Sequence, residues 1–358
     1  MKLPDHQSPY SHIKPSSTFA KSIVCAGALV GSLALMLGAA QAQQQTYLMK
    51  ISTPTIHDIP DTWAKNFGEA VEKDSGGRIK YKVYPASQLG SIPRQIEGAQ
   101  FGSIECEVVP PEFMVGLDPR FEVMAAPALV DSQAHGQRVA ANPAVIKLML
   151  GLGADKGLHG VGLFMAEQSA IVSRMPLRRL DDFKGKKIRI FASEFQSVAF
   201  ERLGVTPVAM SLGDVMPAIQ QGAIDGANTG IGPIANFHMA DAAKYVTQTG
   251  QPAIFIIAEV NKHWYDSLPA DLQKIIDRDG AAQSLAINTF AAKSVKESEA
   301  SYTAAGGELI KLPPGDQAAM MKTISNVATD VSKKDQSLQA AYRIVADAAA
   351  QTRQTPTQ

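Results

Sequence analysis

Two stretches of the chain resemble each other: LGSIPRQIEGAQFGSIE at 89–105 and LGDVMPAIQQGAIDG at 212–226. Each begins with Leu-Gly and continues with a residue that can cap a helix, Ser91 or Asp214. Apolar residues four apart then predict one buried helix face in each stretch. A glycine, a short strand-like segment and an acidic residue follow. Two similar strand–helix–strand units predict two similar lobes.

The rest of the chain alternates strand-like and helix-like segments, an order typical of α/β folds with mostly parallel sheets. The region from Pro269 to Ala305 contains almost no helix breaker except Gly280, and therefore predicts one helix roughly 55 Å long. Such a helix exceeds one lobe, so we expect it to run along both. The predicted strands are 47–52, 79–84, 104–109, 160–164 and 308–312.

The N-terminal region is typical of a secretory signal. Lys14 and Lys21 precede an apolar run at 22–40, and Ala-Gln-Ala at 40–42 is the small-x-small pattern that signal peptidase recognises. We therefore expect export, with cleavage after Ala42. The alternative is an uncleaved membrane anchor, because the run is about long enough to span a bilayer.

The composition is that of a globular protein that buries a sizeable core. Apolar residues make up 45% and charged residues 19%, and 34 basic residues balance 34 acidic ones. Without a basic surplus, no nucleic-acid partner is expected. Cleavage after Ala42 leaves Cys106 as the one cysteine, so we expect no internal disulfide.

Signatures of catalysis and metal binding are missing from the sequence. It contains no G-x-S-x-G elbow, no H-E-x-x-H and no P-loop, and its histidines lack metal-ligand spacing. We therefore expect no enzyme activity, no cofactor and no metal. After Ala42, His57 and Asp58 form the one close His–acid pair. Their loop after the first strand either faces solvent or lines the crevice where open α/β sheets bind ligands.

The most informative charge is Arg189, in the strand-like segment KKIRIF at 186–191. Strand alternation places Arg189 and Phe191 on one face and two isoleucines on the other. A guanidinium keeps its charge, and burying a charge without a partner is costly, so Arg189 needs an anion. That anion is either an internal acid, Glu167 or Glu194, or a ligand that arrives from solution at the strand's carboxyl end.

Longer segments resemble the substrate-binding proteins of tripartite ATP-independent periplasmic (TRAP) transporters, the dicarboxylate-binding DctP-like family. They are GGRIKYKVYPASQLGS at 76–91, LRRLDDFKGKKIRIFAS at 177–193, LGVTPVAMSLGDVMPAIQQGAIDG at 203–226 and NKHWYDSLPADLQKII at 261–276. The resemblance implies a two-lobed α/β periplasmic binding-protein fold with crossing strands and a long helix along both lobes. It also implies a periplasmic receptor that closes over a small organic acid and delivers it to integral-membrane TRAP subunits.

The resemblance also suggests how the chain divides. Residues 1–42 are assigned to the signal peptide and 351–358 to a polar tail. Lobe I is expected to comprise 46–168 plus 254–300, and lobe II 169–253 plus 301–350.

In this family the arginine of a K-x-R motif pairs with the ligand carboxylate, and that motif falls on Arg189. Gln168 replaces a second basic residue that many members carry, and Thr229, preceded by Asn228, replaces a frequent asparagine. Because amides and hydroxyls do not neutralise a charge, we expect a ligand with one carboxylate and an otherwise neutral, apolar body. The remaining candidate ligand contacts are Ser169, Phe191, Leu212 and His57.

Two other functions remain open from the sequence. A ligand sensor would use the same lobes to dock to a signalling receptor, and the sequence does not separate it from a transport receptor. A periplasmic enzyme acting on a carboxylate is disfavoured, because no nucleophile–base pair or metal cluster is evident.

Overall fold

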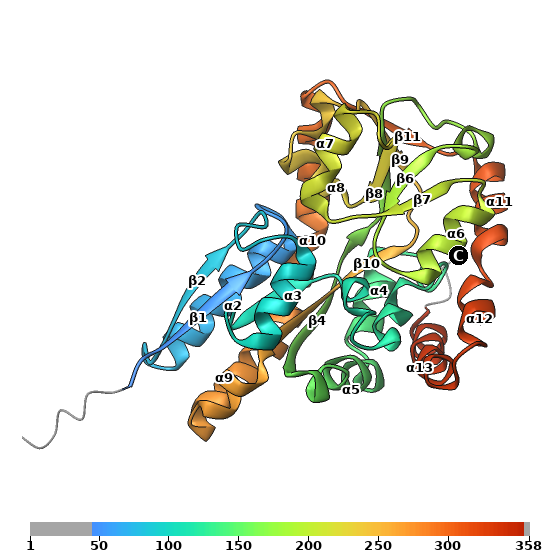
Figure 1. Cartoon of the computed structure of the whole chain (residues 1–358). Coiled ribbons are helices and arrows are strands. Elements are labelled where there is room, and N and C mark those ends of the chain that lie inside the picture. Colours follow the sequence, from blue (N-terminus) through green and yellow to red (C-terminus); the bar gives the residue numbers. More distant parts are fainter. Residues whose placement is uncertain (1–44, 354–358) are drawn as a thin grey trace, which may run out of the picture. The chain divides into compact units, whose positions relative to one another are not determined.

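The computed structural model describes residues 45–353, which form two α/β lobes, each built on one sheet (Figure 1). The predicted signal peptide and its cleavage site lie outside these residues. No helix within residues 45–353 combines the length and the apolar character that a membrane crossing requires. Cys106, the one cysteine in this part of the chain, is a buried free thiol.

Lobe I contains a five-stranded sheet in the order β2-β1-β3-β10-β4. Strands β1, β2 and β3 are parallel to one another, whereas β10 runs antiparallel to both β3 and β4. The strands are β1 (Tyr47–Ser52), β2 (Ile79–Tyr84), β3 (Cys106–Val109), β4 (Leu158–Gln168) and β10 (Ala253–Asn261), and the helices of this part of the chain are α2 (Ile59–Asp74), α3 (Ile92–Phe101), α4 (Gln133–Ala140), α5 (Pro143–Gly151) and α9 (Lys262–Ser267).

Lobe II contains a six-stranded sheet in the order β11-β9-β5-β8-β6-β7. Strand β6 lies between β7 and β8 and is parallel to both, so their carboxyl ends meet at one edge. The strands are β5 (Ala170–Ser173), β6 (Lys187–Ile190), β7 (Thr206–Ala209), β8 (Gly226–Thr229), β9 (Tyr245–Gln248) and β11 (Glu308–Lys311), and the helices are α6 (Glu194–Arg202), α7 (Val215–Gln220) and α8 (Ile231–Asn236).

Two crossings and one long helix join the lobes. Strand β4 continues into β5 with only Ser169 between them, and the chain returns from β9 to β10. Helix α10 (Ala270–Ala304) has 35 residues and contacts α2 and β4 in lobe I and α8 and β11 in lobe II. The predicted long helix is confirmed. Gly280 lets it approach β4, because a Cβ at this position would lie 2.3 Å from the Val161 carbonyl oxygen.

The two similar stretches form similar but unequal units. The first contains α3, and the second contains a short 3₁₀ turn, Leu212–Asp214, followed by α7. Ser91 and Asp214 precede these helices as expected, but neither side chain makes a capping hydrogen bond. In the first unit, a proline in the opening turn of α3 presets a helical φ without needing an N–H partner.

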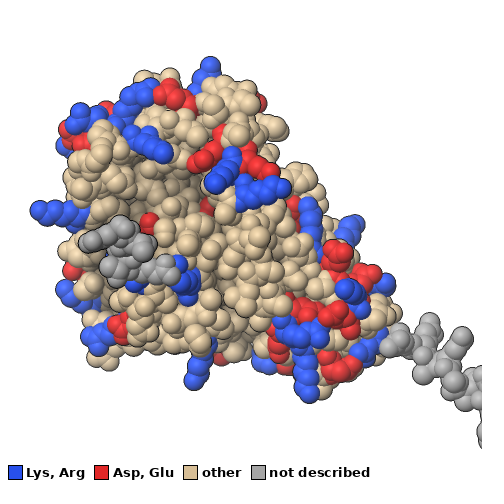
Figure 2. Space-filling view, turned by 180° about the vertical axis from the view of Figure 1, so that it is seen from behind, with Lys and Arg blue, Asp and Glu red and all other residues tan. Residues whose placement is uncertain are grey.

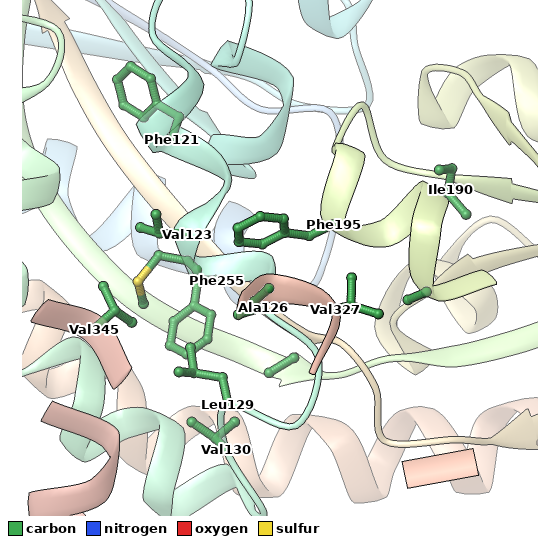
Figure 3. Packing of buried hydrophobic residues seen from close by; sticks show 14 of the residues in the cluster. Phe121, Val123, Ala126, Leu129, Val130, Ile190, Phe195, Phe255, Val327 and Val345 are labelled. Carbon is green, nitrogen blue, oxygen red and sulfur yellow. The ribbon is translucent and has the colours of Figure 1, made fainter. Parts of the chain in front are cut away.

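The lobes also share a buried apolar cluster (Figure 3). Val123 from the 3₁₀ segment η2 (Pro119–Ala125) lies near Phe195 of α6 and Phe255 of β10 in the close-up, and Phe121 belongs to the same segment and cluster. The C-terminal helices cover this cluster: α11 (Pro314–Ile324) and α12 (Val327–Ser332) contact α6, and α13 (Gln336–Thr352) contacts η2, α4 and α5. Helix α13, assigned to lobe II from the sequence, therefore packs on the lobe I part of the chain.

Charges of both signs are interspersed on the face shown in Figure 2, in keeping with the balanced composition. Among the described residues, surface ion pairs join different elements, such as Arg202 with Asp330, 2.9 Å apart. Exposed pairs of this kind contribute little to stability, so the apolar core holds the fold.

Candidate functional site

A cavity lies between the lobes at the carboxyl end of β6. It encloses roughly 460 Å³ of space not filled by atoms, part of it open to solvent. Both lobes contribute walls that are mostly apolar. The lining residues are Pro54, Thr55, Asp58, Pro60, Ile92, Val108, Pro110, Phe113, Ala166, Glu167, Arg189, Phe191, Leu212, Thr229, Gly230, Pro233, Ile254 and Ile256.

Arg189 enters this cavity as a buried cation, only 1% exposed. Its Nε donates to the Met210 carbonyl oxygen and its Nη1 donates to the Asn228 carbonyl oxygen, both at 2.9 Å. The guanidinium lies 4.5 Å from the ring centroid of Phe191 and 5.8 Å from that of Phe113. Two carbonyls and two rings therefore fix the planar fork before any ligand is considered.

No carboxylate of the described residues lies within ion-pair distance of Arg189. Of the two internal acids considered from the sequence, Glu194 pairs with Lys334 at 2.6 Å, and Glu167 accepts a hydrogen bond from the Gly232 N–H. Burial lowers the pKa of Arg189 to about 9, opposed by the charges of Glu112 and Asp214. Neither internal candidate is the partner, and the cation remains poorly compensated.

Two carboxyl groups face the same cavity, those of Asp58 and Glu167. Asp58 Oδ1 accepts from Thr55 Oγ1 at 2.8 Å and from the Asp61 N–H at 3.2 Å, whereas Asp58 Oδ2 has no hydrogen-bond partner among the described residues. Burial raises the pKa of Asp58 to about 7. Burial, followed by the charge of Asp58, raises the pKa of Glu167 to about 8. The two carboxyls therefore favour the protonated form or a cationic partner.

Four of the predicted ligand residues line this cavity: Arg189, Phe191, Leu212 and Thr229. Asn228 is buried beside them, and its backbone oxygen holds Arg189. The side-chain nitrogen and oxygen of Asn228 have no partner among the described residues.

Three other predicted residues lie elsewhere. Gln168 and Ser169 line a second cavity, with residues of α10 such as Lys296 and Glu299. Side chains alternate along β4, so the neighbour of Glu167 points away from the interlobe cavity. His57 is exposed and does not line the interlobe cavity, whereas Asp58 next to it is buried there.

Sequence reasoning left open whether the His57–Asp58 loop lines the crevice, and Asp58 does line the cavity. Among the cavity residues that sequence reasoning missed are Glu167 as a ligand-facing acid and Phe113 beside Arg189. Phe113 belongs to the 3₁₀ segment η1 (Pro111–Met114), directly after β3. Its position after a strand end was the available signal, because such loops face the crevice. No group of three or more His, Cys, Asp or Glu in the described part of the chain is placed to hold a metal ion.

Two α/β lobes that share crossing strands and a long helix, and that enclose a buried arginine, define a two-lobed solute-binding protein. The family described as bacterial extracellular solute-binding protein, family 7 (DctP), matches residues 55–335, and the chain belongs to this family. This confirms the resemblance seen in the sequence. Members of the family are receptors that bind substrates rather than enzymes.

Curated relatives agree with this family. The uncharacterized protein YiiZ of Salmonella typhimurium is 30% identical over 211 residues, which is 59% of this chain and 64% of that protein. The C4-dicarboxylate-binding periplasmic protein DctP of Rhodobacter capsulatus is 27% identical over 320 residues, 86% of this chain and 93% of that protein.

A solved structure agrees with the fold. The sugar acid binding protein DctPAm from Advenella mimigardefordensis, in complex with galactonate, superposes with a TM-score of 0.81 at 20% identity. The match covers 86% of this chain and 99% of that one. The two-lobed fold predicted from the sequence is therefore confirmed.

Proposed function

We propose that this protein is a periplasmic receptor that binds a small organic acid between its lobes and delivers it to a TRAP-type membrane permease. One observation carries the proposal: Arg189 is buried in the interlobe cavity, and no carboxylate of the described residues pairs with it. A carboxylate ligand fits the guanidinium fork and supplies the missing charge. The DctP relative is named for C4-dicarboxylates, and DctPAm holds galactonate, which is also a carboxylate.

Binding acts through hinge closure. Lobe I contributes Asp58, Val108 and Phe113 to the cavity, and lobe II contributes Arg189 and Leu212. A ligand that touches both walls favours the closed state by its differential affinity for that state. Closure also removes water from the guanidinium–carboxylate pair, which strengthens the pair. Micromolar affinity requires about −8 kcal/mol, which one such pair with apolar burial can supply.

The ligand has a single carboxylate. Arg189 is the only basic residue among the described residues that line the cavity, and two acids line it as well. A second ligand carboxylate would face Asp58 or Glu167 without a cation to neutralise it. We assign Phe191, Leu212 and Thr229 to the walls around the ligand, and the Asn228 backbone to positioning Arg189.

The cellular setting follows from the same assignment. We infer export through the N-terminal signal, cleavage after Ala42 and work in the periplasm, where the relative DctP is named as acting. The partners are the small acid and the integral-membrane TRAP subunits. The receptor makes and breaks no bond, so the ligand leaves unchanged.

Calorimetric titration of the purified mature protein tests this proposal. The panel pairs monocarboxylates with dicarboxylates of equal chain length, and includes hydroxy and amino derivatives of the monocarboxylates. We expect saturable binding by at least one monocarboxylate and weaker binding by its dicarboxylate. Binding by dicarboxylates alone would contradict the single-carboxylate assignment, and binding by no acid of the panel would contradict the receptor assignment.

A further inference from the structure

We propose that the ligand is a zwitterion whose carboxylate binds Arg189 and whose cationic amino group binds Asp58 and Glu167. This inference rests on the proposed function, because it takes the carboxylate at Arg189 as given. It replaces the neutral body expected from the sequence with an apolar body that ends in a cation.

Asp58 is the first part of the cationic subsite. It is 1% exposed and lines the cavity, and its Oδ2 has no hydrogen-bond partner among the described residues. Its Oδ1 caps α2 through the Asp61 N–H and also accepts from Thr55 Oγ1. Asp58 Oδ1 therefore stabilises the fold, and Asp58 Oδ2 is available to a hydrogen-bond donor of the ligand.

Glu167 is the second part, and its neighbours are shaped to hold it. It is 4% exposed, lines the cavity, and accepts from the Gly232 N–H at 3.2 Å. A Cβ at Gly230 would lie 1.9 Å from Glu167 Oε1, so the carboxyl fits only because residue 230 has no side chain. No Lys, Arg or His in residues 45–353 forms an ion pair with Asp58 or Glu167.

Asp58 and Glu167 determine which chemical group of a ligand can complete the site. An alkyl end of a ligand would leave the carboxyls without a partner in an apolar cavity, which is costly. A hydroxyl donates one hydrogen and adds no charge. An ammonium donates three hydrogens and neutralises negative charge, so it serves Asp58 and Glu167 together.

The path between the two ends indicates the ligand's length. Arg189 binds the Asn228 carbonyl, whereas Glu167 lies at Gly230 and Gly232, two to four residues further along the chain. Asn228 and Gly230 are two residues apart in extended backbone, a span of roughly 7 Å, which separates the ligand's carboxylate and amine by several bonds. Ile254 and Ile256 contribute apolar wall to the cavity and suit methylene groups. The class is therefore an ω-amino acid.

Matched acids that differ only at the far end test this inference by calorimetry. One set is butyrate, γ-hydroxybutyrate, succinate and γ-aminobutyrate, and the second is the corresponding set built on hexanoate. We expect the amino acid of at least one set to bind about tenfold or more tightly than its alkyl and hydroxy counterparts, since the charge pair forms away from water. A hydroxy acid or diacid that binds as tightly as the amino acid in both sets would overturn the inference.

Variants separate this inference from the receptor assignment. Asp58→Asn and Glu167→Gln keep hydrogen-bond acceptors for α2 and Gly232, and should reduce the amino acid to the affinity of its alkyl counterpart. Glu259→Gln, which replaces a buried carboxyl in the lobe I sheet with an amide, should leave both affinities unchanged. If alkyl or hydroxy acids bind through Arg189 and the amino group adds nothing, the inference fails and the receptor stands. If no acid binds, both fail.

Discussion

The protein contains two pairs of buried carboxyls that are alike in burial and differ in their surroundings. In the core of lobe I, Glu107 of β3 lies directly opposite Glu259 of the antiparallel β10, and both are 0% exposed. Their four oxygens have no hydrogen-bond partner among the described residues. In the interlobe cavity, Asp58 and Glu167 are also buried, at 1% and 4% exposed, but they accept hydrogen bonds from Thr55, Asp61 and Gly232.

The comparison shows that a raised pKa does not by itself mark a binding site. Burial raises the pKa of Glu259 to about 8, and burial with the charge of Glu259 raises the pKa of Glu107 well above its usual range. Burial is also the main reason for the raised pKa values of Asp58 and Glu167, the cavity pair. What distinguishes the cavity pair is its access to a cavity that also holds a cation, and the neighbours that orient it.

The largest effect on ligand binding is expected from substitution of Arg189, the cation in the same cavity as Asp58 and Glu167. Arg189→Ala should weaken binding of the preferred acid by at least about a hundredfold, because truncating one side of a buried charge pair removes most of its energy. Arg189→Lys should restore only part of the affinity, since an ammonium cannot make the bidentate contact. Calorimetry measures both, and unchanged affinity in Arg189→Ala would contradict the site.

Glu107 and Glu259, the core pair, should affect stability and not ligand binding. Its carboxyls are protonated in the folded state, whereas an unfolded Glu ionises near pH 4.3. The stability that Glu259 contributes is therefore fully present below about pH 4.3 and is lost progressively as the pH rises to about 8, by roughly 1.4 kcal/mol per pH unit at most. Glu259→Gln should flatten this decline in urea unfolding between pH 5 and 8. Equal pH slopes in both proteins would rule out this assignment.

Local signals predicted the parts of the fold that local physics determines. Strands β1 and β2 match their predicted bounds, β2 because apolar side chains alternate along it, and α10 matches because almost no breaker interrupts it. Local signals did not predict how distant elements pack against one another. The helical pattern of α13 was visible, but nothing local to it says that it packs on α4 and α5, about 200 residues earlier.

The same limit applies to the site. Arg189 and Phe191 were predicted together because strand alternation puts them on one face, and both line the cavity. Gln168 was predicted as a ligand contact from its position in a family pattern. The path of β4 between the lobes, however, decides which face of this strand meets the cavity. Glu167 meets Gly232 across 65 positions of sequence, so its role depends on a contact that no local pattern encodes.

A smaller effect is expected from the residue that makes room for the cavity pair. Gly230→Ala places a methyl group where Glu167 Oε1 lies, so the carboxyl must move, and affinity for the preferred acid should fall about tenfold. Gly213→Ala is the matched control, because a Cβ at Gly213 meets nothing within 4 Å. Calorimetry on both variants compares them directly. Equal affinities would mean that the position of Glu167 does not matter for binding.

The smallest effect concerns a third kind of buried acid, one that joins the lobes. Glu122 of η2, on the lobe I part of the chain, accepts from Ser193 Oγ at 3.0 Å and from the Phe195 N–H at 3.1 Å, at the start of α6 in lobe II. These bonds to a carboxylate at a helix N-terminus favour lobe contact. Glu122→Gln should therefore weaken ligand binding about threefold, since a neutral acceptor makes weaker bonds.

Glu194→Gln provides the comparison for this variant, because Glu194 lies at the same end of α6 but forms only an exposed pair with Lys334. Such a pair contributes less than about 1 kcal/mol, so its loss should change neither affinity nor closure measurably. Small-angle scattering with and without the preferred acid reports closure, and calorimetry reports affinity. If Glu122→Gln and Glu194→Gln behave alike, the buried contact does not couple the lobes, and closure depends on the ligand and the shared apolar cluster alone.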